Sequence, residues 1–261
     1  FLLYHFNASY YEKTYAHLQE LVQKHKQNID TFLNEKLGNI QFLVESNSFD
    51  RLTDESILRK KLQYLQNEYG DVFVDLGVVD ETGKQLAYAG PYELHDVQYF
   101  EAGWFKQAIT KDYFISDVFM GFRGSPHFII TVRFEYEPVV YILRATIDFQ
   151  YFNNLVENLR VGETGYAFIL NDEGRFQTRP VFEKSLWQKT YDYFVERMEA
   201  TQKPVEIIEL PDETGRMHIY AIASLKDGQW LMIFKQQKGD AFSDIYQMFQ
   251  FAAVIFVLGA A

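Results

Sequence analysis

The residues best suited to chemistry lie on two neighbouring β-rich stretches, 127–134 and 139–148. Alternate residues of a strand point to opposite faces. One face of the second stretch therefore carries Arg144 and Asp148, and one face of the first carries His127 and Arg133. The opposite faces are apolar. A half-exposed antiparallel sheet has such a polar face toward solvent, but this one is poor in Lys and Glu.

Nearby aromatic residues give this face the composition of a small-molecule pocket, which is mostly apolar with a few convergent polar groups. Guanidinium groups bind carboxylates in bidentate fashion, and the carboxylate of Asp148 suits an amino group. We therefore hypothesise a small anionic or zwitterionic ligand. The candidate ligand-binding residues are Trp104, Phe105, Tyr113, Phe119, Arg123, His127, Arg133, Arg144 and Asp148.

Motifs for other chemistry are missing from the sequence. The six His form no HExxH or similar metal spacing, and there is no GxSxG, GxxxxGK[ST] or GxGxxG motif. The chain has no Cys, which excludes thiol nucleophiles, disulfides and Cys-based zinc sites. A net charge of −11 argues against nucleic acid as a partner. We expect no catalytic residue, metal or cofactor in this segment.

The elements that position the candidate residues follow from hydrophobic periodicity. The chain is 48% hydrophobic and contains 24 Phe and 18 Tyr, which is ample for a packed core. Apolar residues at helical spacing predict one long amphipathic helix over 9–46. A helix over 54–69, with Thr53 as its N-cap, follows. Strands are expected at 72–79, 84–90, 114–119, 127–136 and 139–148, and helices at 99–109 and 149–159.

The pattern then starts again. A strand at 165–170, an acidic turn ending in Gly174 and a strand at 175–179 repeat the arrangement around Gly83, 91 positions earlier. A helix at 185–200, strands at 205–210, 217–223 and 230–236, and a helix from about 239 complete the copy. We predict an α+β fold of two PAS-like modules, each with a central antiparallel sheet. The expected boundaries are 1–46 for the long helix, 47–150 and 151–237 for the modules, and 238–261 for the last helix.

Both ends of the chain are apolar. Residues 245–261 carry no charge, and 251–261 are wholly apolar, whereas a membrane-spanning helix needs about 20 such residues. Residues 1–6 are apolar apart from His5. We interpret the chain as an extracytoplasmic segment held at the membrane by flanking transmembrane helices. The alternative is a C-terminal helix buried in a core.

The chain resembles the double Cache (tandem PAS-like) sensor domains of bacterial transmembrane receptors over nearly its whole length. The stretches that carry the resemblance are Trp104–Ala108, Tyr113–Val118 with Pro126–Thr131, Ile142–Asp148 and Val161–Leu170. The resemblance implies a membrane-distal module that holds the ligand and a proximal module beside the membrane.

Amino-acid-sensing members contact their ligand through a Trp-aromatic pair and a late Asp. Trp104, Phe105 and Asp148 match these positions. The Arg that precedes the Trp by two residues in those members is Ala102 here, and the later Tyr and Asp are Phe119 and Gly121. The amino-acid motif is therefore broken. The segments 121–127 and 143–148 look like those of sensor histidine kinases.

We therefore predict a ligand-sensing domain of a histidine kinase. The alternatives are a chemotaxis receptor, a cyclic-dinucleotide enzyme, a free-standing solute-binding protein or hydrolase, and a membrane-tethered spacer that binds nothing. A homodimer through Leu18, Val22 and Ile29 is one role for the apolar stripe of the long helix. Covering the sheet is the other.

Overall fold

The computed structural model describes residues 2–94, 97–121, 124–179, 188–201, 203–212 and 214–243. The chain divides into two compact units. The first unit is Thr31–Leu155, and the second unit combines Phe1–Asp30 with Val156–Ala261. The long helix α1 (Leu2–Glu45) supplies residues to both units.

The first unit is built on an antiparallel sheet in the order β2-β1-β6-β5-β3, with β4 pairing with β5. Its strands are β1 (Phe73–Asp80), β2 (Gln85–Ala89), β3 (Tyr113–Ile115), β4 (Phe119–Met120), β5 (Pro126–Tyr136) and β6 (Val139–Asp148). Its helices are α2 (Phe49–Thr53), α3 (Glu55–Tyr69), η1 (Gly70–Val72), α4 (Gly103–Ala108) and α5 (Phe149–Glu157), whose last two residues belong to the second unit.

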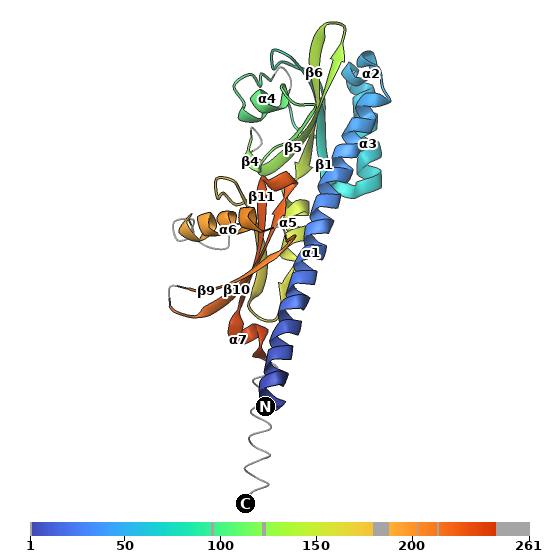
Figure 1. Ribbon diagram of the computed structural model, residues 1–261. Helices are drawn as coiled ribbons and strands as arrows, with labels where there is room; N and C mark the ends of the chain where they lie inside the picture. The colour runs from blue at the N-terminus through green and yellow to red at the C-terminus, as the bar shows by residue number, and fades with distance from the viewer. Residues whose placement is uncertain are drawn as a thin grey trace, which may run out of the picture. The chain divides into compact units, whose positions relative to one another are not determined.

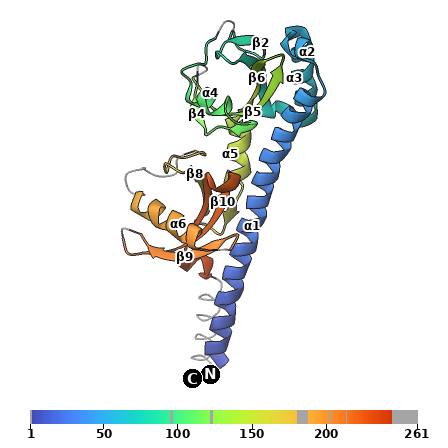
Figure 2. The same ribbon diagram turned by 45° about the horizontal axis from the view of Figure 1, so that its top comes forward.

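The two faces of this sheet are covered by different helices. Figures 1 and 2 show α1 and α3 on one side of the sheet and α4 on the other. On the α1 side, Phe128 of β5 meets Phe152 of α5 edge-on at 5.2 Å, and Phe152 lies 6.2 Å from Phe32 of α1. The apolar face therefore turns toward the long helix, as the alternation of residues predicts.

The register of the sheet brings the predicted polar residues to the other face. His127 pairs with Asp148, and Thr131 pairs with Arg144. Directly opposed residues of antiparallel strands point to the same side. The polar sides of β5 and β6 consequently form one continuous surface under α4.

The second unit repeats this plan. Its sheet has the order β7-β8-β11-β10-β9, and all its strand pairs are antiparallel. Its strands are β7 (Arg160–Val161), β8 (Gly165–Asn171), β9 (Glu206–Pro211), β10 (Met217–Leu225) and β11 (Trp230–Gln237). Its further helices are α6 (Gln188–Ala200), η3 (Lys226–Gly228) and α7 (Lys238–Ala241). The predicted α+β fold with two antiparallel sheets is confirmed.

The repeated turns have a common structure. Asp80 and Asn171 each accept hydrogen bonds from backbone N–H groups two and four residues ahead. Gly83 and Gly174 follow with positive φ, a conformation that glycine adopts without strain. A third turn of the same kind, led by Asp212, precedes β10. The repeat seen in the sequence thus reflects one turn chemistry.

Several predicted elements differ from the structure. The strand expected at 175–179 is reduced to an isolated bridge between Phe176 and Leu170, and the helix expected at 99–109 covers only Gly103–Ala108, as α4. The N-cap of α3 is Asp54, whose side chain accepts from the N–H groups of Ser56 (2.8 Å) and Ile57 (3.2 Å). Thr53 is instead the last residue of α2, and its hydroxyl donates to the carbonyl of Phe49, the first residue of that helix. The strand expected at 114–119 is divided into β3 and β4, because the hydroxyl of Ser116 takes the hydrogen bond of the Ile129 N–H.

The expected final helix begins at Lys238, as α7. The apolar tail from residue 245 lies outside the described residues. Among the helices of the described part, none has the length and apolar character that crossing a membrane requires.

The turn glycines offer a matched test of packing. Gly215 has φ +80° with open space around it, so Gly215→Ala should cost roughly 1–2 kcal/mol for the left-handed backbone alone. Gly83 has φ +84°, and a Cβ there would lie 2.5 Å from the backbone nitrogen of Phe100. We expect Gly83→Ala to lower the free energy of unfolding by more than Gly215→Ala does. Denaturant titration measures both, and equal losses would contradict the predicted clash.

Candidate ligand site on the first sheet

The centre of the polar face is a buried ion pair. Nη1 of Arg144 on β6 lies 2.9 Å from Oδ1 of Asp75 on β1. The two side chains are 3% and 0% exposed. Removing two charges from water is costly, and their attraction compensates only when the remaining donors and acceptors are also satisfied. Whether the buried pair stabilises or destabilises the unit therefore depends on the hydrogen bonds that surround it.

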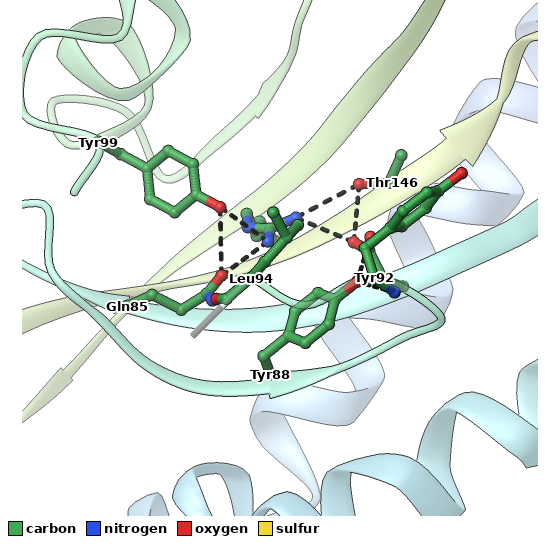
Figure 3. A network of polar contacts seen from close by, with 8 residues as sticks. Gln85, Tyr88, Tyr92, Leu94, Tyr99 and Thr146 are labelled. Atoms are coloured by element: carbon green, nitrogen blue, oxygen red, sulfur yellow. Dashed lines mark hydrogen bonds and ion pairs between the residues drawn. The ribbon is translucent and has the colours of Figure 1, made fainter. Parts of the chain in front are cut away.

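Four polar side chains complete the network around the pair (Figure 3). Asp75 accepts from the hydroxyls of Thr146 (2.8 Å) and Tyr88 (3.2 Å). Nη2 of Arg144 donates to Oε1 of Gln85 (2.7 Å) and to the hydroxyl of Tyr99 (3.0 Å). Within the described part of the chain, Nε of Arg144 is buried without a hydrogen-bond partner.

Arg144 stays charged. Burial by itself lowers the pKa of Arg144, but the carboxylate of Asp75 and the phenol oxygens of Tyr99 and Tyr88 act in the opposite direction. The net result is a raised pKa. The site therefore presents one fixed positive and one negative group, side by side.

Two glycines make room for this network. Gly77 pairs with Arg144 across the sheet, and a Cβ there would lie 3.0 Å from Nε of Arg144 and 3.1 Å from Oε1 of Gln85. Gly90 follows β2, and a Cβ there would lie 2.3 Å from the Tyr88 hydroxyl and 2.4 Å from Cβ of Asp75. The backbone at Gly77 therefore lies directly against Arg144, and that at Gly90 lies directly against Asp75 and Tyr88, where a larger residue would collide with the network.

A register shift brings the two β2 residues of the network to one face. Gly77 pairs with Tyr88 and Val78 with Ala87, but Val79 pairs with Gln85. Leu86 is passed over and remains partly exposed. Tyr88 and Gln85 are three positions apart and would face opposite sides of a regular strand. The shift is a bulge-like irregularity, and because of it both side chains reach the Arg144–Asp75 pair.

An aromatic wall adjoins the network. Phe105 and Phe114 are buried in a cluster with Val79, Ile142 and Tyr99, and Trp104 packs against it. The ring of Trp104 lies 5.0 Å from that of Tyr99 and 5.8 Å from that of Phe105. Tyr99 belongs to both parts, because its ring packs in the wall and its hydroxyl bonds to Arg144. The arrangement combines an apolar surface with two opposite charges.

The other end of the face carries His127 and Asp148. The His127 ring lies 4.5 Å from the ring of Phe119, and its Nδ1 is 2.9 Å from the carbonyl oxygen of Ser125. Oδ1 of Asp148 accepts from the N–H of Tyr151 at 2.7 Å and so caps α5. A ligand contact from Asp148 stays a prediction, and the structure shows a capping role beside it.

Two of the predicted residues, Tyr113 and Arg133, do not join the rest. Tyr113 pairs with Val132, which places it on the opposite face of the sheet, where it is 45% exposed. Arg133 lies near the surface and bonds to Glu135 at 2.6 Å. Arg123 lies outside the described residues.

Sequence reasoning did not include Asp75, Gln85, Tyr88 and Tyr99 in the site. A signal existed for Asp75, since it is the single charged residue within the apolar stretch 72–79. A lone buried charge requires a partner, and Arg144 is the nearest candidate on a neighbouring strand. Gln85 had no such signal, because its orientation depends on the register shift. No group of His, Asp and Glu in the described residues could hold a metal ion.

The described part of the chain thus combines two antiparallel α+β units, both of which include residues of α1, with a buried polar network on one sheet face of the first. A family model described as "Cache domain" matches residues 6–245. The chain therefore belongs to the Cache domain family. A search of curated protein sequences finds no significant match.

Several solved structures share this fold. The extracellular domain of soHK1S-Z6, a protein assigned as a histidine kinase, has 14% identity and a TM-score of 0.67, with 91% of this chain and 99% of that chain covered. The ligand-binding domain of the Pseudomonas fluorescens chemoreceptor CtaA, in complex with L-isoleucine, has 17% identity and a TM-score of 0.66, with 90% and 97% covered. The Pseudomonas aeruginosa PAO1 amino acid chemoreceptor PctC, in complex with GABA, has 16% identity and a TM-score of 0.61, with 85% and 99% covered.

The ion pair itself is open to a direct test. Arg144→Met leaves the carboxylate of Asp75 buried without its cationic partner, so it should lower the free energy of unfolding by about 3–5 kcal/mol. The double variant Arg144→Met with Asp75→Leu removes both charges and should recover a large part of this loss. Urea denaturation of the two variants and the parent chain measures the difference. A double variant less stable than Arg144→Met would contradict the proposed cause.

Proposed function

We propose that this chain is the extracytoplasmic ligand-sensing domain of a transmembrane receptor whose output is a histidine kinase. Membership of the Cache family and the shared fold with a histidine-kinase extracellular domain support this assignment. In this proposal the first unit, which includes the predicted module 47–150, binds the ligand, and the second corresponds to the membrane-proximal module.

The observation that carries the binding proposal is the buried Arg144–Asp75 pair beside the aromatic wall. The pair is neutral overall, so a bound anion alone would place a net negative charge in a buried site. A zwitterion adds no net charge. In this proposal its carboxylate and ammonium group reach Arg144 and Asp75 when the side chains that cover the pair, such as Tyr99 and Gln85, move aside. A small zwitterion therefore fits the described charges better than a simple anion, and both remain within the original hypothesis.

A chemotaxis receptor is the second candidate for the whole protein. The likeness to the chemoreceptors CtaA and PctC favours it, and both were solved with small zwitterionic molecules. The two candidates share the same sensing role for this chain. They differ only in the output domain proposed for the whole protein.

Calorimetric titration with matched ligands tests the charge preference. GABA, butyrate and n-butylamine share a carbon chain and differ in which charges they carry. L-isoleucine and L-asparagine extend the series to α-amino acids. We expect saturable binding of at least one zwitterion, at least tenfold tighter than the matched anion or amine, which corresponds to about 1.4 kcal/mol. Saturable binding of simple cations alone would contradict the proposal. So would the absence of saturable binding across a wider panel of organic acids and amines.

Substitution of Trp104 tests where the ligand binds. Trp104→Ala removes the partly buried ring beside Tyr99 and should weaken the affinity for the best zwitterion at least tenfold, whereas Trp104→Phe should restore most of it. Phe42→Ala is the control, because Phe42 is 67% exposed on α1. Unchanged affinity of the folded Trp104→Ala variant would place the ligand elsewhere.

A further inference from the structure

The segment that follows the last strand is tied to the second unit in three places. This segment, Lys238–Ser243, includes α7 and comes directly after β11. Here two carboxylates and a buried aromatic ring hold six residues, and each attachment reaches a different part of the unit.

The first attachment is the carboxylate of Asp240. It accepts hydrogen bonds from the backbone N–H groups of Glu163 (3.1 Å) and Thr164 (3.0 Å), and from the hydroxyl of Thr164 (2.7 Å). The side-chain amide of Gln236 donates a further bond at 3.0 Å. Thr164 in turn accepts from the N–H of Gln237 at 3.1 Å. The turn between β7 and β8 and the start of α7 are thus joined in one closed network.

The backbone of the turn is shaped for this carboxylate. Gly162 has φ +62°, and a Cβ there would lie 2.6 Å from Oδ2 of Asp240. Burial raises the pKa of Asp240, but the hydrogen bonds from Gln236 and Thr164 outweigh it and lower the pKa overall. Asp240 is therefore ionised near neutral pH, and its bonds are of the stronger charge-assisted kind.

The second attachment joins Lys238 to β9. Nζ of Lys238 lies 2.7 Å from Oε2 of Glu209, and the Tyr15 hydroxyl of α1 donates to the same carboxylate. The third attachment is Phe242, which is fully buried. Its ring centroid lies 4.2 Å from that of Tyr11, 5.7 Å from that of Tyr15 and 6.3 Å from that of Tyr10. The segment is consequently fixed to α1, to β9 and to the β7–β8 turn together.

We propose that Lys238–Ser243 is a rigid output joint, in which Asp240 locks the chain leaving the sheet to the β7–β8 turn so that both move with α1 as one body. This inference rests on the proposed receptor function, because a receptor must pass a displacement on to the residues that follow. A flexible linker at this position would lose such a displacement. A joint held by Asp240, Glu209 and Phe242 transmits it.

The chain has no Cys, so two introduced cysteines can carry spin labels without background. Asn28→Cys on the exposed side of α1 and Ser243→Cys at the end of the joint both lie in the second unit. Pulsed electron paramagnetic resonance on the labelled full chain should give one narrow distance distribution.

Asp240→Asn turns an acceptor into an amide that faces the donors of Thr164 and Gln236. We expect it to widen the distance distribution at least twofold. Thr164→Val keeps the shape of the side chain, removes its hydrogen bonds and should also widen the distribution. Asp227→Asn makes the same charge change at an exposed position of the same unit and should leave the distribution narrow.

Thermal melting identifies which variants are folded. If Asp240→Asn does not fold, Thr164→Val decides the question. A folded variant of either kind with the parental narrow distribution would overturn the joint. If the receptor proposal is wrong, the calorimetric titration shows no binding of small molecules. The distance measurement does not depend on ligand binding, so the two failures can be told apart.

Discussion

A charge buried in a protein is costly unless it is paired and hydrogen-bonded, and in the first unit this constraint falls on Arg144 and Asp75. Neither side chain has access to water that would solvate it. Tyr88, Tyr99, Gln85 and Thr146 therefore supply the bonds that water would otherwise make. Gly77 and Gly90 supply the space. The polar residues and glycines of β1, β2 and β6 are therefore explained together, because each polar side chain supplies a hydrogen bond that another one needs and the glycines leave room for them.

The sequence was sufficient to predict the architecture and one face of the site. Strands 127–136 and 139–148 alternate so regularly that the polar face around Arg144 and His127 followed from the two-residue period. Gln85 was not predicted as part of the site, because a register shift reverses the face of β2 on which it lies. Tyr113 was assigned to the site by proximity in sequence, but the pairing of β3 with Val132 turns it to the other side. Periodicity predicts faces within a strand and says little about how neighbouring strands are aligned.

The two units share a turn chemistry and an antiparallel sheet in which the first long strand pairs with the last (β1 with β6, β8 with β11), yet they use the equivalent sheet face differently. In the second unit this face is filled by an apolar cluster that includes Phe168, Ile222 and Ile233, against which Phe194 of α6 packs. In the first unit the corresponding region keeps an ion pair and a partly exposed Trp104. A duplicated module can thus retain one core as a structural support while the other acquires polar groups. This difference is the reason to look for a ligand in the first unit.

The skipped residue Leu86 has an implication for how such domains diverge. Because the register shift decides whether Gln85 faces the ion pair, losing or gaining one residue in β2 would exchange the side chain presented there. An edge strand tolerates such a change more readily than a central one. The recognition chemistry of related domains can therefore vary through changes in strand length as well as through substitutions, and comparisons that align only residue types would overlook it.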